Sequence, residues 1–232
     1  MFHRNIVVGP FQCNCRLLAC PKTGDAILID PGDEPEAILA TIKEFSLSQG
    51  MDLHIKYLLH THGHLDHIGG TRDVYQHLHS QKMADPKKDN APKIALHRDD
   101  QPLYTNLKVQ GQLFGLDFED PLPVNHYLQD MEEIQVGELK FTIIHTPGHS
   151  PGSISIRLHE NQTSRISETV FSGDTLFQGS VGRTDLWGAN QEQMFKSIRK
   201  RLLTLDDDTL VCPGHGPDTR IGIEKRQNPF LV

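Results

Sequence analysis

Short apolar runs and amphipathic stretches alternate along the chain, separated by Gly, Pro and Asp residues. Runs of this kind predict strands, whereas apolar residues spaced three and four positions apart predict helices. The predicted strands span residues 15–19, 26–29, 55–59, 94–96, 154–158, 169–171 and 209–211, with a further pair over 129–145 that turns at Gly137. The predicted helices span residues 34–45, 66–79 and 191–205. The first two strands form a hairpin around a turn at residues 21–24.

Two stretches lack a regular pattern. Residues 80–93 are polar and contain two prolines, so we expect an exposed loop there. Residues 100–125 carry scattered Gly and Pro, and no element is predicted for them. The chain has 232 residues, 37% of them hydrophobic, and no repeat or linker divides it. We therefore expect a single α/β domain over residues 1–232, with sheets covered by helices.

Charge and composition narrow the range of partners. The formal net charge is −7, and no Lys/Arg-rich stripe is visible, which argues against a nucleic-acid partner. The first residues lack the apolar core of a signal peptide, and no apolar run approaches membrane-spanning length. The sequence thus predicts a cytoplasmic protein that acts on a small molecule, away from membranes.

The chain has four cysteines, Cys13, Cys15, Cys20 and Cys212. Their number and spacing do not resemble the disulfide framework of a secreted domain. Cysteine is among the most buried residue types, so we expect packed thiols in the core instead of metal ligands.

Histidine is the unusual component, with 14 residues. Four of them, together with Asp66, fall within residues 60–67, directly after the predicted strand 55–59. Solvated surface histidines are the plain alternative, but His149, Asp174 and His215 also follow short apolar runs and have glycine beside them. Because the carboxyl ends of strands gather at one edge of a layered fold, these side chains are expected to meet in one site.

The residue types in this group suit divalent metal ions. Neutral imidazole binds zinc, iron or nickel, and a carboxylate can bridge two cations. Two bound cations could activate a water molecule for hydrolysis. A purely structural zinc site is the alternative, but such sites have four ligands and prefer thiolate, which this group lacks. The candidate ligands are His62, His64, Asp66, His67, His149, Asp174 and His215.

Five motifs appear in order along the chain: Ile29-Asp30-Pro31-Gly32, Thr61 to His67 (THGHLDH), His145-Thr146-Pro147-Gly148-His149, Ser172-Gly173-Asp174-Thr175 and Pro213-Gly214-His215-Gly216. In these motifs the sequence resembles the metallo-β-lactamase superfamily, and specifically its compact glyoxalase II-like (hydroxyacylglutathione hydrolase-like) branch. The resemblance runs over nearly the whole chain and implies an αββα four-layer sandwich.

The resemblance also implies roles for the candidate residues. One metal ion would be held by His62, His64 and His149, the other by Asp66, His67 and His215, with Asp174 bridging both. Asp66 would in addition act in catalysis by orienting the attacking water. Asp30 would be a buried support residue beside the site. Arg183 matches the region where such enzymes place a cationic glutathione contact, and Lys225 and Arg226 could add further charge.

The implied activity is hydrolysis of a thioester such as S-lactoylglutathione by two divalent metal ions, with zinc preferred and iron or manganese as alternatives. One rival is an iron-dependent persulfide dioxygenase of the same superfamily, with a single metal on His62, His149 and Asp174. Lactonase or phosphodiesterase activity on the same metal pair is a further alternative, because the fold and the metals do not fix the substrate.

Overall fold

The computed structural model describes residues 2–83, 91–160 and 167–232, and contains two six-stranded sheets. The first sheet has the order β1-β2-β3-β4-β5-β6, and its strands are β1 (Phe2–Val8), β2 (Cys13–Ala19), β3 (Asp25–Ile29), β4 (His54–Leu59), β5 (Lys93–His97) and β6 (His126–Leu128). The second has the order β14-β13-β10-β9-β8-β7, and its strands are β7 (Glu133–Val136), β8 (Leu139–His145), β9 (Ile154–Leu158), β10 (Thr169–Gly173), β13 (Leu210–Pro213) and β14 (Thr219–Arg220). A small separate pair consists of β11 (Leu176–Phe177) and β12 (Ser180–Val181).

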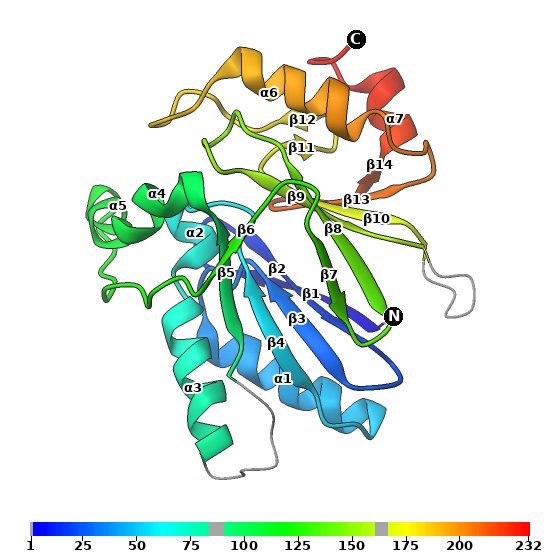
Figure 1. Ribbon diagram of the computed structural model, residues 1–232. Helices are drawn as coiled ribbons and strands as arrows, with labels where there is room; N and C mark the ends of the chain where they lie inside the picture. The colour runs from blue at the N-terminus through cyan, green and yellow to red at the C-terminus, as the bar shows by residue number, and fades with distance from the viewer. Residues whose placement is uncertain (1, 84–90, 161–166) are drawn as a thin grey trace.

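The helices form the two outer layers. Near the first sheet lie α1 (Pro35–Gln49), α2 (Leu65–Ile68), α3 (Thr71–Met83), the short helix η1 (Arg98–Asp100), α4 (Gln101–Thr105) and α5 (Leu107–Leu113). Near the second lie α6 (Gln191–Ser197), the π-helical continuation η2 (Ile198–Leu202) and α7 (Ile221–Gln227). Figure 1 shows α1 and α3 on the outer side of the first sheet and α6 and α7 above the second.

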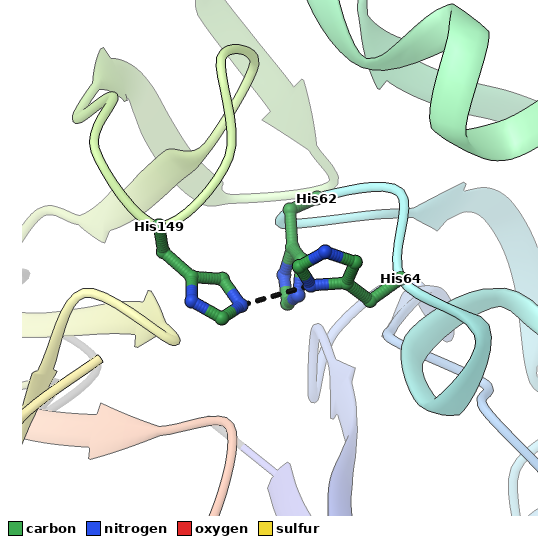
Figure 2. A group of neighbouring side chains, drawn as sticks. All are labelled: His62, His64 and His149. Atoms are coloured by element: carbon green, nitrogen blue, oxygen red, sulfur yellow. Dashed lines mark hydrogen bonds between the residues drawn. The ribbon is translucent and has the colours of Figure 1, made fainter. Parts of the chain in front are cut away.

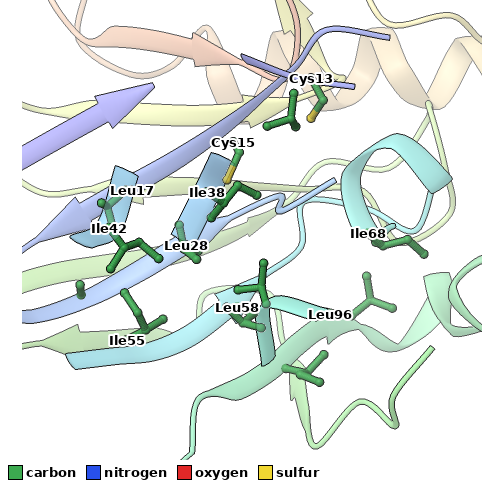
Figure 3. Packing of buried hydrophobic residues seen from close by; sticks show 14 of the residues in the cluster. Cys13, Cys15, Leu17, Leu28, Ile38, Ile42, Ile55, Leu58, Ile68 and Leu96 are labelled. Carbon is green, nitrogen blue, oxygen red and sulfur yellow. The ribbon is translucent and has the colours of Figure 1, made fainter. Parts of the chain in front are cut away.

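Strand alternation explains the layers. In β3, Ala26 and Leu28 pack outward under the helices, whereas Ile27 and Ile29 point toward the second sheet. Successive side chains of a strand point to opposite faces, so an apolar strand contributes to two layers of core. Figure 3 shows the core between the first sheet and its helices, where Leu28 packs near Ile38 of α1.

Three hydrophobic clusters fill the spaces between the layers. One lies between the first sheet and α1–α5, the second between the two sheets, and the third between the second sheet and the helices α6 and α7. In the third cluster Met194 and Ile198 pack against Val170 and Val211. Three interlayer cores require four layers, so the predicted αββα sandwich is confirmed.

The structure confirms most of the predicted elements and corrects others. The hairpin of β2 and β3, the pairing of β7 with β8 and the bounds of β9 agree with the sequence pattern. The single helix expected over 66–79 is wrong, because α2 ends at Ile68 and α3 begins at Thr71. The helix expected over 191–205 changes to a π-helix at Ile198 and ends at Leu202.

Close backbone contact explains the break between α2 and α3. The N–H of Gly70 donates hydrogen bonds to the carbonyl oxygens of Pro31 and Gly32, at 3.0 Å each. A Cβ on Gly32 would overlap the carbonyl oxygen of Asp66, and one on Gly69 would clash with Gly32. Glycine permits this approach because it has no side chain, and the contact positions Asp66 beside the Pro31-Gly32 turn.

Residues 100–125 contain helices that the sequence pattern did not indicate, namely α4 and α5, followed by irregular chain up to β6. The loop expected over 80–93 is too long at both ends, because α3 continues to Met83 and β5 already starts at Lys93. Residues 84–90 of that loop lie outside the described residues.

The four cysteines are buried and free, as the sequence predicted. Among residues 2–83, 91–160 and 167–232, no helix combines the length and apolar character that crossing a bilayer requires.

Candidate metal centre

Every candidate donor follows the carboxyl end of a strand. Residues 60–67 begin directly after β4, His149 follows β8, Asp174 comes directly after β10, and His215 follows β13. Strand β4 runs parallel to β3, and β13 runs parallel to β10. The structure brings all seven candidate residues together in three overlapping groups, each with donor atoms within 4.8 Å of one another.

The first group contains His62, His64 and His149. Figure 2 shows their rings pointing toward one another, two from the loop after β4 and one from the loop after β8. His64 Nδ1 lies 2.9 Å from His149 Nε2. His62 Nε2 is buried and has no hydrogen-bond partner. A buried nitrogen lone pair without a donor is costly, so this arrangement suits a cation between the rings.

The second group contains Asp66, His67 and His215. His67 Nε2 lies 3.2 Å from His215 Nε2, and His215 Nε2 lies 3.2 Å from Asp66 Oδ2. Two ring nitrogens and a carboxylate oxygen therefore converge on one point, as the ligands of a divalent cation do.

Asp174 lies between the two groups. Its Oδ2 is 3.5 Å from His149 Nε2 and 3.6 Å from His215 Nε2, and its Oδ1 is 3.4 Å from His67 Nε2. Oδ1 is buried and makes no hydrogen bond. A carboxylate that reaches nitrogens of both groups fits a bridging position between two cations. The donor set therefore fits a pair of divalent metal ions.

Backbone carbonyls fix the tautomers of two of these rings. His149 Nδ1 lies 2.8 Å from the carbonyl oxygen of Arg183, and His215 Nδ1 lies 3.0 Å from that of Phe11. A carbonyl oxygen only accepts, so each Nδ1 carries the proton and donates it. Each Nε2 then keeps its lone pair directed into the site, as metal-binding histidines require.

Asp30, the predicted support residue, contacts the ring of His67 in a similar way. Its Oδ2 lies 3.0 Å from His67 Nδ1 and accepts a hydrogen bond from Thr61 Oγ1 at 2.7 Å, while its Oδ1 accepts one from the Thr61 N–H. Asp30 is buried and has a left-handed backbone, with φ of 53°. Strain of this kind persists where surrounding contacts impose it, and it concentrates at functional sites.

The pKa values of the first group favour neutral rings. Burial, together with the charge of His67, holds the pKa of His62 well below its ordinary value. Burial and the neighbouring His149 lower the pKa of His64 to about 3. Neutral imidazole is the form that binds metal, so no proton needs to be displaced here.

In the second group, the neighbouring charges outweigh burial and favour the ionised side chains. Burial disfavours a charged His215, but its hydrogen bond to Asp66 and the charge of Asp174 raise its pKa overall. Burial likewise opposes ionisation of Asp66, yet His67 and His215 hold the pKa of this carboxyl well below its usual range. A divalent cation can replace the proton on His215, because it satisfies the same carboxylates.

Two residues that the sequence analysis missed hold the loops of the site. Asp100 is buried, and its carboxylate accepts hydrogen bonds from the N–H groups of Gly63 and Gly152 and from Ser150 Oγ, at 2.8, 2.5 and 2.6 Å. It therefore links the His62–His64 loop to the loop that carries His149. Burial raises the pKa of Asp100, against the opposing effect of these hydrogen bonds.

Gln110 of α5 supports the same loop from the other side. Its Nε2 donates to the carbonyl oxygens of Gly63 and Leu103, and its Oε1 accepts from the N–H of Leu65. No sequence motif indicated either Asp100 or Gln110, because both belong to the stretch without a regular pattern.

A cavity of about 590 Å³ opens beside the donors. Its lining includes five of the seven candidates: His64, Asp66, His149, Asp174 and His215. The remaining wall comes from the β1–β2 loop, Leu65 of α2, α4, α5 with the following Phe114, β11 and β12, and residues 183–187.

Arg183, the residue predicted to contact substrate, lines this cavity. Its guanidinium pairs with Asp185 through two bonds of 2.7 and 2.8 Å. Lys225 and Arg226 instead pair with Asp207, and neither lines the cavity.

The comparisons with known proteins agree with this architecture. A family model described as the metallo-β-lactamase superfamily matches residues 8–215. Hydroxyacylglutathione hydrolase GloC of Haemophilus influenzae is 40% identical over 227 residues, which cover 97% of this chain and 96% of that protein.

Two solved structures are similar over nearly their whole length. The BLEG-1 B3 metallo-β-lactamase is 33% identical with a TM-score of 0.82, and the match covers 100% of both chains. TTHA1623, solved in a di-iron-bound form, is 38% identical with a TM-score of 0.75, and the match covers 98% of this chain and 100% of that one. The chain thus belongs to the metallo-β-lactamase superfamily of metallo-hydrolases.

Proposed function

We propose that this protein hydrolyses a small-molecule thioester, such as S-lactoylglutathione, with two divalent metal ions, as a single-domain enzyme of the cytoplasm. One observation carries the proposal. Seven imidazole and carboxylate side chains converge at the wall of an open cavity, and two of their buried donor atoms, His62 Nε2 and Asp174 Oδ1, have no hydrogen-bond partner.

The ligand assignment follows the two groups. One ion would be held by His62, His64 and His149, the other by Asp66, His67 and His215, and Asp174 would contact both. When bound, the ions would lower the pKa of a water molecule and polarise the substrate carbonyl. Zinc suits imidazole and carboxylate ligands, and so does iron. TTHA1623, with two bound irons, supports a metal pair in this fold.

The side chains of the chain have defined tasks in the reaction. Asp66 lines the cavity, where its carboxylate can accept a hydrogen bond from the attacking water and orient it. The water oxygen adds to the acyl carbon, and the carbon–sulfur bond then breaks with its electron pair on sulfur. A thiolate is a good leaving group near neutral pH, so no side chain has to protonate it first. The carbonyls of Phe11 and Arg183 and the carboxylate of Asp30 keep the donor rings oriented throughout.

Similarity to the hydrolase GloC of Haemophilus influenzae supports the thioester class. Metal content per chain, measured on protein purified without added metal, tests the proposal together with two assays on the same sample: hydrolysis of S-lactoylglutathione and of simple acyl thioesters, and oxygen uptake with glutathione persulfide. About two metals per chain with thioester turnover is the expected result. One iron per chain with oxygen uptake and no hydrolysis would replace the proposal with the persulfide dioxygenase. A metal pair that cleaves only lactones or phosphodiesters would also refute it.

A double variant, His62→Ala with His64→Ala, is expected to lose metal from the first group and to reduce turnover at least about 100-fold. His79→Ala is the matched control, because His79 is an exposed histidine of α3 outside the donor groups. Full turnover by the double variant without bound metal would contradict the mechanism.

A further inference from the structure

The wall of the cavity is mostly apolar outside the metal-binding groups. Nine of its lining residues are Phe, Leu, Val or Trp, and only Gln110, Ser180 and Arg183 are polar. The apolar residues come from separate parts of the chain, among them Leu113 of α5 and Phe177 of β11. Ligand sites combine an apolar wall with a few polar groups that orient the reacting atoms, and here the metal centre would supply that orientation.

Several of the largest apolar side chains at this cavity remain exposed. Leu113 is 78% exposed, Trp187 65% and Phe114 55%, and Phe11 packs edge-on against Phe114 with ring centroids 5.2 Å apart. Apolar side chains that gather in contact with solvent around a cavity mark a surface that a ligand covers. The exposed group borders the donors directly, because the carbonyl of Phe11 accepts the hydrogen bond from His215.

Two of the three polar wall residues are already engaged by the protein itself. The amide of Gln110 makes three hydrogen bonds to backbone groups of Gly63, Leu65 and Leu103. The guanidinium of Arg183 faces the carboxylate of Asp185 in a bidentate pair. Arg183 is the single lysine or arginine among the described residues that line this cavity, and the carboxylate of Asp185 offsets its positive charge.

We infer, on the basis of the proposed thioester hydrolysis, that the preferred substrate carries an uncharged, apolar acyl chain or ring next to the reacting carbonyl, and that a glutathione moiety adds little to its binding. The reaction consumes one water. A carbon–oxygen bond forms at the acyl carbon, the carbon–sulfur bond breaks, and the products are an apolar carboxylate, a thiol and one proton.

Charge explains why the glutathione part contributes little. Glutathione presents two carboxylates and one ammonium group. Moving a carboxylate out of water costs free energy unless a cation pairs with it. To bind the Nε–Nη2 edge of Arg183, such a carboxylate has to compete with Asp185, which already accepts a hydrogen bond from each of these two nitrogens. An apolar acyl group instead covers Leu113, Phe114 and Trp187 and removes their surfaces from water.

Four thioesters distinguish the contribution of the acyl group from that of the thiol. Lactoyl and hexanoyl groups are each joined to glutathione and to the uncharged thiol N-acetylcysteamine, and kcat/KM is measured on the metal-loaded protein. Hexanoyl esters are expected to exceed lactoyl esters at least about 10-fold with either thiol, because each added methylene in an apolar site contributes to binding. Exchange of glutathione for N-acetylcysteamine is expected to change kcat/KM by less than about threefold, since most of the selectivity lies in the acyl contact.

Two leucine variants provide a matched comparison. Leu113→Ala is expected to raise KM for hexanoyl esters about 5- to 10-fold with little change in kcat, and to leave lactoyl esters nearly unchanged. Leu47→Ala is the control, because Leu47 is 73% exposed on α1 and does not line the cavity. Circular dichroism and Tm verify that both variants remain folded.

The possible outcomes separate the inference from the proposed function. A preference for S-lactoylglutathione over both N-acetylcysteamine esters, unaltered by Leu113→Ala, would overturn the apolar substrate while the thioester hydrolase stands. Absence of turnover for all four esters by protein with two metals per chain would refute the proposed function and the inference with it. An acyl preference that Leu47→Ala reduces as much as Leu113→Ala would also overturn the assignment to this cavity.

Discussion

Replacement of Asp100 by Asn tests whether one buried carboxylate aligns the two histidine loops. Asp100 Oδ2 accepts from the Gly63 N–H and Ser150 Oγ, and Oδ1 accepts from the Gly152 N–H. An amide offers one oxygen and one NH₂ group in place of two oxygens. In either orientation, the NH₂ group faces a backbone N–H, so at least one hydrogen bond is replaced by two opposed donors.

The magnitude follows from the bonds that are lost. A hydrogen bond to a charged group contributes about 1.5–3 kcal/mol, and the unpaired buried donor adds its own desolvation penalty. We therefore expect Asp100→Asn to lower the free energy of unfolding by about 2–4 kcal/mol, or the Tm by roughly 5–15 °C. Because the two loops carry His64 and His149, metal affinity is expected to fall about 10- to 100-fold as well.

Thermal unfolding and competition with a chelator measure the two effects on the same protein. Glu168→Gln is the control, because Glu168 accepts hydrogen bonds from Arg157 and Thr209 but lies in no donor group. The control is expected to lose stability without losing metal affinity. A wild-type Tm for Asp100→Asn would refute the energetic reasoning, and a lowered Tm with unchanged metal affinity would show that Asp100 does not position the donors.

Three further predictions concern the metal, a glycine and a partly buried histidine, His3. Removal of metal by a chelator should abolish thioester turnover and lower the Tm in calorimetry, because an ion that binds only the folded state stabilises it; full turnover without metal would contradict this. Gly214→Ala places a methyl group into Asp174 Oδ1 and should release metal, whereas Gly216→Ala, which has open space but a left-handed φ of 72°, should lose stability and still retain metal in the same content assay. Burial and the charge of a neighbouring arginine lower the pKa of His3 to about 4, from an ordinary value of 6.5. As the pH falls, the unfolded chain therefore takes up a proton on His3 before the folded protein does. The contribution of His3 to the free energy of unfolding is fully present above pH 6.5 and falls by about 2 kcal/mol toward pH 4.5. His3→Leu should remove that part of the pH dependence in urea unfolding, and an unaltered slope would refute the assignment.

The positions of the donors could be predicted because local sequence and topology agree there. His149, Asp174 and His215 each follow a short apolar run, and such runs became the strands β8, β10 and β13. Strand ends meet at an edge of a layered fold regardless of the detailed packing. Period-two alternation in strands such as β3 similarly fixes which side chains enter each layer of core.

The remaining features depend on contacts between distant segments. The break after Ile68 results from the approach of Gly69 and Gly70 to the Pro31-Gly32 turn, which no local propensity encodes. Helices α4 and α5 span five and seven residues, which is too short for a helical periodicity to emerge. Asp100 and Gln110 lie in this stretch, so their hydrogen bonds to the donor loops could not be predicted from residue spacing.

The hydrogen bonds around the candidate donors also couple the candidate metal centre to the adjoining cavity. Phe11 and Arg183 both line the cavity with their side chains, while their backbone carbonyls accept from His215 and His149. A substitution at either position changes the wall but leaves the carbonyl in place, so the wall can vary without loss of the tautomers that metal binding requires. Asp30 differs, because its side chain holds His67 and no backbone group can replace it. The structure thus separates wall positions, which can change with the substrate, from the positions that the proposed metal pair would constrain, and a shared fold can in this way serve many substrates.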